Sequence, residues 1–399
     1  MNAPRIALVH DWLATSNGGS ERVVAQILKV FPGSDVFTLF DRIPAGRRTF
    51  LDASKVTTSF LQRLAGHGGK YRYLLPAMPL AIESLDLSSY DLVLSSSHAV
   101  AKGVLTGPKQ LHICYCHTPI RYAWDLQHQY LAESGLAKGP LKYLAMAMLQ
   151  YIRMWDYRTA SGVDHFIANS EFVARRIQKV YHRESTVIYP PVNVDDFPVA
   201  GSREDFYVVV ARLVPYKRVG LLLKAFELLP ERRLLVIGEG PLLASLRRES
   251  PANVTLLGSQ AFDSMRDYLQ RARAFLYAAE EDFGISIVEA QACGTPVISY
   301  GSGGARETVI GNETGVFFDQ QTPESVADAI RTFESTENQF SPELIRANAQ
   351  RFSAEAFRSR YRSFVLKGCC AQQFSPLLRN WAESQTESTA ARSAMTAMS

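Results

Sequence analysis

Short apolar runs recur along the chain, and each is followed by a polar turn and a longer amphipathic segment. Continuous apolar runs of this kind are typical of strands that are buried on both faces of a parallel sheet. The strands predicted in the first half of the chain lie at residues 5–9, 36–39, 92–95, 111–116 and 165–168. Their alternation with helical segments predicts a doubly wound α/β domain.

The same alternation begins again after a pair of prolines. In the segment YPPVNVDDF, Pro190 and Pro191 follow an apolar run, and prolines force extended backbone and end regular structure. We therefore place a domain boundary near residue 195. The strands predicted beyond it share the short apolar pattern and lie at residues 207–210, 234–237, 254–257, 274–277, 296–299 and 315–318.

A chain of 399 residues is long for one hydrophobic core, so its length also predicts two domains. We expect the first domain over residues 1–195 and the second over residues 196–365. A helix over residues 366–383 is expected to pack back on the first domain. Residues 384–399 are rich in Ser, Thr and Ala, and we expect this tail to be disordered.

The composition narrows the function classes. An apolar content of 47% and a charged content of 21% are those of a soluble globular enzyme. The net charge of +4 is small and gives no reason to expect a nucleic-acid partner. The first apolar run ends at His10 and Asp11, so we expect a first strand there rather than a signal peptide, and a cytoplasmic location. The five cysteines lack Cys-x-x-Cys spacing, which indicates reduced thiols and no metal site.

The stretch YAAEEDFGISIVEAQACGTPVIS, residues 277–299, reads as strand, loop, helix and strand. Glu281 lies in the loop, and Glu289 lies inside the helix. A carboxylate can accept two adjacent hydroxyl groups of a sugar, and the backbone N–H groups at a helix start can donate to anionic oxygens. An ordinary βα unit with an acidic first turn has the same pattern. The stretch alone leaves both interpretations open.

Further candidate side chains follow other predicted strands. The segment ARLVPYKR places Arg212 and Lys217 after the strand at 207–210, and Gly238 begins the segment GEGP after the next strand. Open α/β sheets bind ligands at the carboxyl ends of their strands, so these loops predict a ligand site. In the first domain, Gly18 and Gly19 lie between a strand and a helix. Their spacing is not that of a dinucleotide fingerprint, and a plain turn is the common alternative.

His117 follows the predicted strand at 111–116 in the segment CYCHTPIRYAWD. A single histidine after a strand is most often structural, and His112 and His165 receive that interpretation. The strand-end position and the following Thr118 and Pro119 favour a site role for His117. The weaker candidates at other strand ends are His10, Asp11, Asn169 and Ser170.

Together these motifs resemble the retaining glycosyltransferases of family 4, which have the GT-B fold of two facing Rossmann-like domains with a cleft between them. The pairs Glu281-x7-Glu289 and Arg212-x4-Lys217 carry the resemblance, which covers nearly the whole chain. The segments CYCHTPIRYAWD and WDYRTASGVDHFIANSEFVARRI are similar to the GDP-mannose-dependent mannosyltransferases of O-antigen and exopolysaccharide assembly.

The resemblance implies a role for each candidate. Arg212 and Lys217 would hold the donor diphosphate, and Glu289 would accept the ribose hydroxyls. Glu281 and His117 would be the catalytic residues, Glu281 beneath the anomeric centre and His117 beside the reacting sugar. The remaining donor contacts would come from the second-domain loops and, across the cleft, from the glycine pair of the first domain: Gly238, Phe283, Gly284, Ile285, Ser286, Gly18 and Gly19.

The resemblance also implies a metal-independent reaction without a cofactor, in which a nucleotide diphosphate sugar is the co-substrate. No Asp-x-Asp motif precedes a strand end, so the basic pair and a helix N-terminus would stabilise the diphosphate. The acceptor would be a lipid-linked glycan or a saccharide. The leaving phosphate would take the proton of the acceptor hydroxyl on the same face of the sugar.

Three alternatives stay open. A family 4 transferase with a UDP-sugar donor would share the same motifs. A sugar-nucleotide 2-epimerase of the same fold would release free sugar without an acceptor. A non-catalytic nucleotide-sugar sensor is disfavoured because Glu281 and His117 are both present.

Two segments raise the question of membrane contact. Residues 55–85 interleave basic and apolar side chains, a composition that suits an anionic lipid surface. Packing of these apolar residues on the domain core is the default, so peripheral contact with the inner membrane face is a hypothesis. The helix predicted at 140–160 is rich in Leu and Met, and we expect it to be buried or to line the acceptor site.

Overall fold

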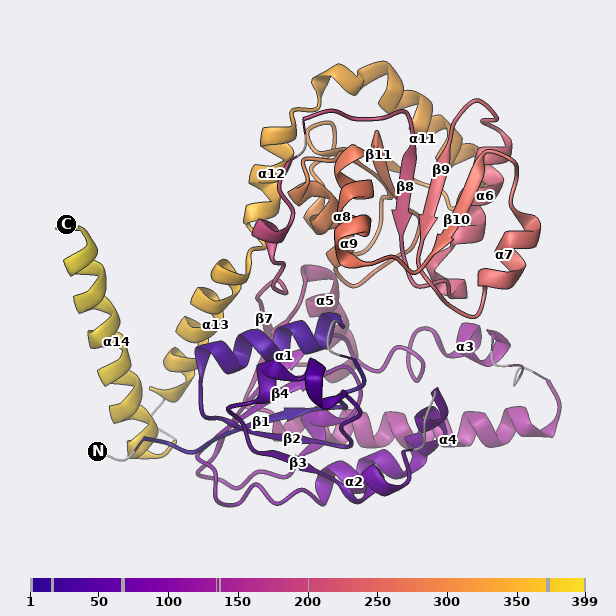
Figure 1. The fold of residues 1–399 in the computed structure, drawn as a ribbon. Coiled ribbons are helices and arrows are strands. Elements are labelled where there is room, and N and C mark those ends of the chain that lie inside the picture. The colour runs from indigo at the N-terminus through magenta and orange to yellow at the C-terminus, as the bar shows by residue number, and fades with distance from the viewer. Residues whose placement is uncertain are drawn as a thin grey trace. The chain divides into compact units, whose positions relative to one another are not determined.

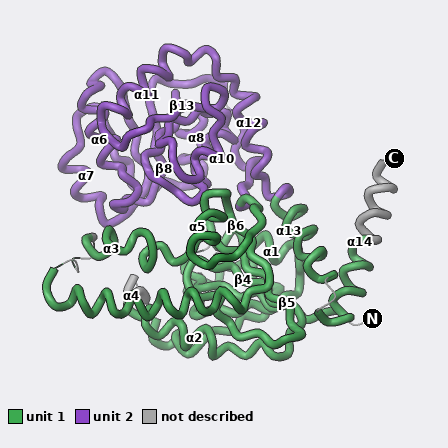
Figure 2. The backbone as a smooth tube through the Cα atoms, turned by 180° about the vertical axis from the view of Figure 1, so that it is seen from behind, with its two compact units in different colours: residues 1–189, 357–399 green, residues 190–356 purple. Residues whose placement is uncertain are grey.

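The computed structural model describes residues 3–15, 18–65, 69–133, 135, 138–199, 201–370 and 374–397 (Figure 1). The chain forms two compact units, coloured separately in Figure 2. Unit 1 comprises residues 1–189 and 357–399, and unit 2 comprises residues 190–356. The structure therefore divides the chain at Pro190 and Phe357, where the sequence suggested residues 195 and 365.

Unit 1 is built on a seven-stranded parallel sheet with the order β3-β2-β1-β4-β5-β6-β7. The strands are β1 (Ile6–His10), β2 (Asp35–Thr38), β3 (Val56–Thr58), β4 (Leu92–Ser97), β5 (Leu111–Cys116), β6 (His165–Ala168) and β7 (Ser185–Val187). Sequence analysis missed β3 and β7. Both are three-residue edge strands that contain Thr or Ser and are only partly buried, so they lack the apolar run that marks the inner strands.

The helices of unit 1 mostly alternate with its strands, as expected of a doubly wound domain. They are α1 (Gly19–Val30), α2 (Met78–Glu83), α3 (Gln127–Glu133), α4 (Pro140–Thr159), α5 (Glu171–Tyr181), α13 (Ala354–Cys369) and α14 (Pro376–Ala397). In α1, Val23, Val24 and Ile27 are fully buried in a cluster with Leu8 and Leu94 of the sheet. Burial of such side chains stabilises the unit by about 2 kcal/mol each.

Unit 2 contains a six-stranded parallel sheet with the order β10-β9-β8-β11-β12-β13. Its strands are β8 (Tyr207–Val210), β9 (Leu234–Ile237), β10 (Val254–Gly258), β11 (Ala274–Tyr277), β12 (Val297–Tyr300) and β13 (Gly315–Phe318). Its helices are α6 (Val219–Glu227), α7 (Leu243–Glu249), α8 (Phe262–Arg271), α9 (Ile285–Ala292), α10 (Ala305–Thr308), α11 (Pro323–Thr336) and α12 (Pro342–Gln350).

Helix α13 carries the chain back to unit 1. Phe357, Tyr361 and Val365 are buried in the same cluster as Leu8 and Ile113 of the unit 1 sheet. Unit 1 therefore begins again at Phe357 rather than at residue 365, because the Phe357 side chain already packs in the core of unit 1. Helix α14 continues to Ala397, so residues 384–397 of the segment predicted to be disordered lie in a helix.

The cysteines are free thiols. Cys114 and Cys116 on β5 point into one cluster with Phe166 and Val173, so they share a face of the strand. Burial raises the pKa of Cys114 to about 12, so this thiol stays protonated and serves as core packing. Among the described residues, no helix combines the length and apolar content needed to cross a bilayer.

Candidate functional site

The strand order of unit 2 reverses between β8 and β11. The chain runs outward from β8 through β9 to β10, and then returns to β11 on the other side of β8. The connecting helices therefore leave the sheet in opposite directions at this point, which is where open α/β sheets bind their ligands. Lys217 follows β8 and Glu281 follows β11, so the strand order brings the two predicted site residues together.

Lys217 and Glu281 form an ion pair at this switch point. The Nζ atom of Lys217 lies 2.7 Å from Oε1 of Glu281 and donates a hydrogen bond of 3.1 Å to the Tyr277 hydroxyl. Both side chains of the ion pair are largely buried, with exposed fractions of 17% and 16%. Burial by itself lowers the pKa of Lys217, but Tyr277 and Glu281 outweigh it and hold the pKa above its ordinary value. Lys217 is thus a fixed cation.

The loop before α9 is held by the loop after β12. The N–H of Gly304 donates to the Glu281 carbonyl at 2.7 Å, and the Ser302 hydroxyl donates to Glu280 at 2.5 Å. A Cβ atom on Gly303 would lie 2.4 Å from the Glu281 carbonyl oxygen, so only glycine permits this approach. Gly284 has a φ of +88° and ends the loop as the N-cap of α9. The position of Glu281 is therefore set by backbone contacts on both sides.

The other residues of this predicted site occupy different environments. Glu289 lies on α9 and is 6% exposed. The Phe283 side chain is buried against Phe352, with ring centroids 5.4 Å apart. Any ligand contact of this residue would therefore be made by its backbone. Ile285 and Ser286 begin α9 and are half-buried.

The loops after β8 and β9 are bound to one another. The N–H of Leu213 donates to the Glu239 carbonyl at 2.8 Å. Gly238 has a φ of +143°, and a Cβ atom there would lie 1.9 Å from the Ala211 carbonyl oxygen. This close contact accounts for the glycine at 238. Arg212 extends from the same pair of loops and is exposed.

Unit 1 has its own switch point, between β1 and β4. Asp11 follows β1 and is fully buried. Its carboxylate accepts hydrogen bonds from the backbone N–H groups of His98, Ala99, Val100 and Ala101, at 2.6, 3.1, 2.6 and 2.7 Å. The side chain therefore fixes the turn that follows β4.

Three histidine rings surround this turn. The His98 ring lies 6.0 Å from the His10 ring and 6.2 Å from the His117 ring, measured between centroids. The Nδ1 atom of His98 is 3.0 Å from Asp11, and Nδ1 of His10 is 3.0 Å from the Ser96 carbonyl. The Nε2 atom of His117 is 2.9 Å from the Ser96 hydroxyl. His117 therefore belongs to a polar cluster at the carboxyl ends of β1, β4 and β5.

The charges of these groups differ. Burial by itself lowers the pKa of His98, but Asp11 raises it above its ordinary value. Burial lowers the pKa of His117 well below its ordinary value, and His98 and His10 add to that effect. Burial by itself raises the pKa of Asp11, yet His98 and His10 hold it below its ordinary range. The cluster thus combines a carboxylate with a histidine, His98, whose pKa that carboxylate raises, and with a neutral His117.

Gly18 is the N-cap of α1, and Gly19 is its first residue. A Cβ atom on Gly18 would lie 2.1 Å from a carboxylate oxygen of Glu21, which is itself buried. The Glu21 carboxylate therefore occupies the space in which a side chain at residue 18 would lie. Ser170 accepts a hydrogen bond from the N–H of Val173 at 3.1 Å, so it is the N-cap of α5.

Sequence reasoning missed several members of these clusters. Tyr277, the hydroxyl partner of Lys217, ends the apolar run of β11, and nothing in the run distinguishes it from a core aromatic. His98 lies in the segment SSSHAVAKG after β4. A strand-end histidine is the same signal that identified His117, so His98 could have been found. Its pairing with Asp11 required the strand order.

Two family models match the chain. The model described as Glycosyltransferase Family 4 matches residues 17–196, and the model described as Glycosyl transferases group 1 matches residues 195–352. The chain belongs to the glycosyltransferases of family 4. The two matches meet within six residues of the division between units 1 and 2, at Pro190.

Curated relatives of this glycosyltransferase are distant. A GDP-mannose-dependent alpha-(1-6)-phosphatidylinositol monomannoside mannosyltransferase of Mycobacterium tuberculosis is 29% identical over 215 residues, which are 46% of this chain and 56% of the relative. A D-inositol 3-phosphate glycosyltransferase of Mycobacterium sp. (strain JLS) is 30% identical over 233 residues, 51% of this chain and 49% of the relative. The chain spans about half the length of the curated relatives that it matches.

Solved structures show the fold. Anabaena HepE in complex with UDP has a TM-score of 0.63 at 18% identity, and the match covers 90% of this chain and 99% of that chain. Sucrose-phosphate synthase from Thermosynechococcus elongatus has a TM-score of 0.71 at 17% identity, with 90% and 98% covered. The glycosyltransferase thus has the GT-B fold of two Rossmann-like units.

Proposed function

We propose that this glycosyltransferase transfers mannose, with retention of configuration, from GDP-mannose to a lipid-linked or saccharide acceptor in surface polysaccharide synthesis. The observation that carries the proposal is the contact between Lys217 and Glu281 at the switch point of unit 2. A buried cation beside a carboxylate offers one group for a diphosphate and another for sugar hydroxyls. The resemblance of the unit 1 motifs and the name of the mycobacterial mannosyltransferase support mannose and GDP.

Each residue of unit 2 has a defined task in this proposal. Lys217 and Arg212 neutralise the charge that grows on the leaving diphosphate, and Glu289 accepts the ribose hydroxyls. Glu281 holds donor-sugar hydroxyls. Its backbone carbonyl is held by the Gly304 N–H, and its carboxylate by Lys217. Gly238, Phe283, Gly284, Ile285 and Ser286 provide donor contacts through their backbone and through the start of α9.

The proposed reaction needs no metal ion and no cofactor. The bond between the anomeric carbon and the diphosphate oxygen breaks, and a bond forms from that carbon to the acceptor oxygen. The acceptor proton passes to the leaving phosphate on the same face. In unit 1, His117 is the proposed contact of the reacting sugar. Its lowered pKa keeps the ring neutral, so it can form a hydrogen bond with a sugar hydroxyl without adding a charge to the site.

The proposal predicts different losses for the two members of the ion pair. Glu281→Ala should lower the rate of transfer by about 100-fold to 1000-fold, because a preorganised partner of the transition state is removed, while donor binding survives. Lys217→Ala should weaken donor binding by about 10-fold to 100-fold, the usual effect of losing a hydrogen bond to a charged group. The measurements are GDP release with acceptor present and isothermal titration of the donor.

Controls come from α6, which carries exposed residues of the same types. Lys224→Ala and Glu227→Ala should change neither donor binding nor transfer. Full activity of Glu281→Ala or of Lys217→Ala would contradict the site.

A donor panel separates the remaining alternatives. Consumption of a UDP-sugar in preference to GDP-mannose would contradict the donor, and free sugar released without acceptor would indicate a 2-epimerase. The anomeric configuration of the product, read by NMR, tests retention.

A further inference from the structure

Helix α4 presents an exposed apolar surface in unit 1. Its buried residues are Ile152, Trp155, Asp156 and Thr159, all in its carboxy-terminal half. The expectation of a buried helix therefore fails for most of its length, and Figures 1 and 2 show its N-terminal half extending past the sheet. Its large exposed apolar side chains, with exposed fractions between 47% and 71%, are Leu141, Tyr143, Leu144, Tyr151, Met154 and Tyr157.

Five of these six side chains, all but Leu141, form one stripe together with Ala147. From Tyr143 and Leu144 the exposed positions continue at Ala147, Tyr151, Met154 and Tyr157, in steps of three or four residues. Residues at this spacing lie on one face of an α-helix. We call residues 143, 144, 147, 151, 154 and 157 the α4 stripe. A single exposed apolar residue is ordinary, but a contiguous row of this kind indicates an interaction surface.

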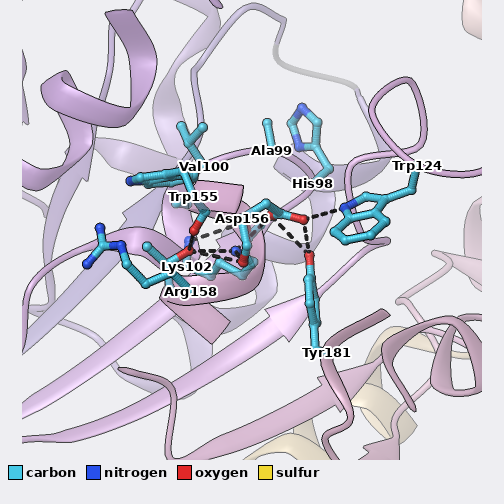
Figure 3. A network of polar contacts seen from close by, with 12 residues as sticks. His98, Ala99, Val100, Lys102, Trp124, Trp155, Asp156, Arg158 and Tyr181 are labelled. Carbon is cyan, nitrogen blue, oxygen red and sulfur yellow. Dashed lines mark hydrogen bonds and ion pairs between the residues drawn. The ribbon is translucent and has the colours of Figure 1, made fainter. Parts of the chain in front are cut away.

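The exposed charges that α4 itself carries are of one sign. Asp156 is the acidic residue of α4, and it is fully buried in an ion pair of 2.8 Å with Lys102 (Figure 3). The basic residues of the helix are Lys142, Arg153 and Arg158, and Lys138 precedes it and is exposed. Arg158 also reaches Glu83 of α2. No exposed carboxylate therefore lies along the described part of α4.

A second exposed group adjoins the helix. Leu75 packs in one cluster with Leu149 and Ile152 of α4, and Trp155 donates to Glu83 of α2 at 2.7 Å. The segment between residues 60 and 83 thus lies beside α4. It buries Leu61, Met78, Ala81 and Ile82 in the core, while Phe60, Leu64, Tyr73 and Leu80 stay exposed. Only some of the apolar side chains of residues 55–85 are therefore exposed enough for the membrane contact hypothesised from the sequence, and α4 adds further exposed apolar side chains beside them.

We propose that the α4 stripe docks on the surface of an anionic phospholipid bilayer. Leu144 and Met154 would enter the boundary between headgroups and acyl chains. Tyr143, Tyr151 and Tyr157 have apolar rings with a polar tip, which suits the same boundary. Lys138 and Lys142 would meet the lipid phosphates. A second copy of the chain suits the stripe less well, since helix pairing would bring the cations of two α4 helices together without an exposed carboxylate to neutralise them.

The test is flotation of the full chain with vesicles of phosphatidylcholine alone and of phosphatidylcholine mixed with phosphatidylglycerol. Wild-type protein should float with the anionic vesicles, and binding should weaken as salt is raised, since salt screens exposed charges. The variant Leu144→Ser, Tyr151→Ser, Met154→Ser should bind at least about tenfold more weakly, because the apolar side chains that enter the bilayer are removed. These residues are exposed, so the fold should survive, which circular dichroism checks.

The matched control is Leu344→Ser with Leu228→Ser in unit 2, whose side chains are 61% and 45% exposed. This control should float like wild type. Equal binding of the triple variant, equal binding to neutral vesicles, or no binding of wild type would each overturn the proposal. A lipid-free dimer in sedimentation that the triple variant abolishes would assign the stripe to a second copy instead. The assay contains no donor, so a wrong donor assignment leaves its outcome unchanged.

Discussion

Lys102 is a buried cation of unit 1 whose Nζ atom is surrounded by hydrogen-bonding partners. Its side chain is 1% exposed, and its Nζ atom contacts the Asp156 carboxylate, the Asp156 carbonyl at 2.7 Å and Thr159 at 2.9 Å. Trp124 and Tyr181 donate to the same carboxylate (Figure 3). A buried charge pair is tolerated when its remaining hydrogen-bonding groups are satisfied, as they are here. The network joins the turn after β4 to α4 and α5.

Lys102→Met should destabilise unit 1 by about 3–5 kcal/mol, because it leaves the Asp156 carboxylate buried without a cation. Arg158→Met is the matched control, since the Arg158 side chain is 62% exposed and its pair with Glu83 lies at the surface. That change should cost at most about 1 kcal/mol. Urea denaturation measures both. Equal losses in the two variants would contradict the assigned role of the buried pair.

Among the secondary-structure elements of unit 1, side chains connect neighbouring strands. His112 on β5 contacts the Ser95 hydroxyl of β4 through Nε2 at 2.8 Å and the Gly162 carbonyl through Nδ1 at 3.2 Å. These contacts agree with the structural interpretation of this histidine. Burial lowers its pKa to about 4 from an ordinary value of 6.5, so the strand pair contains a neutral imidazole.

This burial makes the stability of unit 1 depend on pH. Between pH 6.5 and about 4 the unfolded chain binds a proton at His112 that the folded chain does not. Stability should therefore fall as the pH is lowered through that window, by up to about 3 kcal/mol for this residue. His112→Gln keeps a partner for Ser95 and should reduce the slope of unfolding free energy against pH. An unchanged slope in His112→Gln would contradict the prediction.

The whole molecule is organised by the return of α13 to unit 1. Phe357 and Tyr361 stack with ring centroids 5.4 Å apart, and both face Tyr115 of β5. The last part of the chain therefore completes the core of the first unit. Unit 1 cannot bury this face of its sheet until the whole of unit 2 has been synthesised.

Substitutions of Tyr361 test the packing of α13 on unit 1, because Tyr361 is not one of the candidate site residues. Its side chain is fully buried, and its hydroxyl has no partner within the described residues. Tyr361→Phe should leave stability unchanged or raise it by up to about 1 kcal/mol, since a buried unpaired hydroxyl is removed. Tyr361→Ala should cost about 3–5 kcal/mol through the cavity it creates.

Hydrogen exchange measured by mass spectrometry should show that Tyr361→Ala lowers the protection of backbone amides in unit 1. Phe333→Ala, at a fully buried position of the unit 2 core, should place its loss in unit 2. Loss of protection across both units in each variant would contradict the division of the chain at Pro190 and Phe357.

Sequence alone determined the α/β class and the inner strands, because buried strands impose their periodicity locally. The helix expected at 366–383 instead falls in two helices, α13 (Ala354–Cys369) and α14 (Pro376–Ala397). Sequence also determined which loops carry charged residues at strand ends, and through them the family. Tertiary structure decided what those residues touch. The pairing of Lys217 with Glu281 and of Asp11 with the turn at 98–101 follows from strand order, which joins segments more than 60 residues apart. The edge strands β3 and β7, the return of Phe357 and the exposed face of α4 were decided there too, because exposure depends on which neighbours the fold supplies.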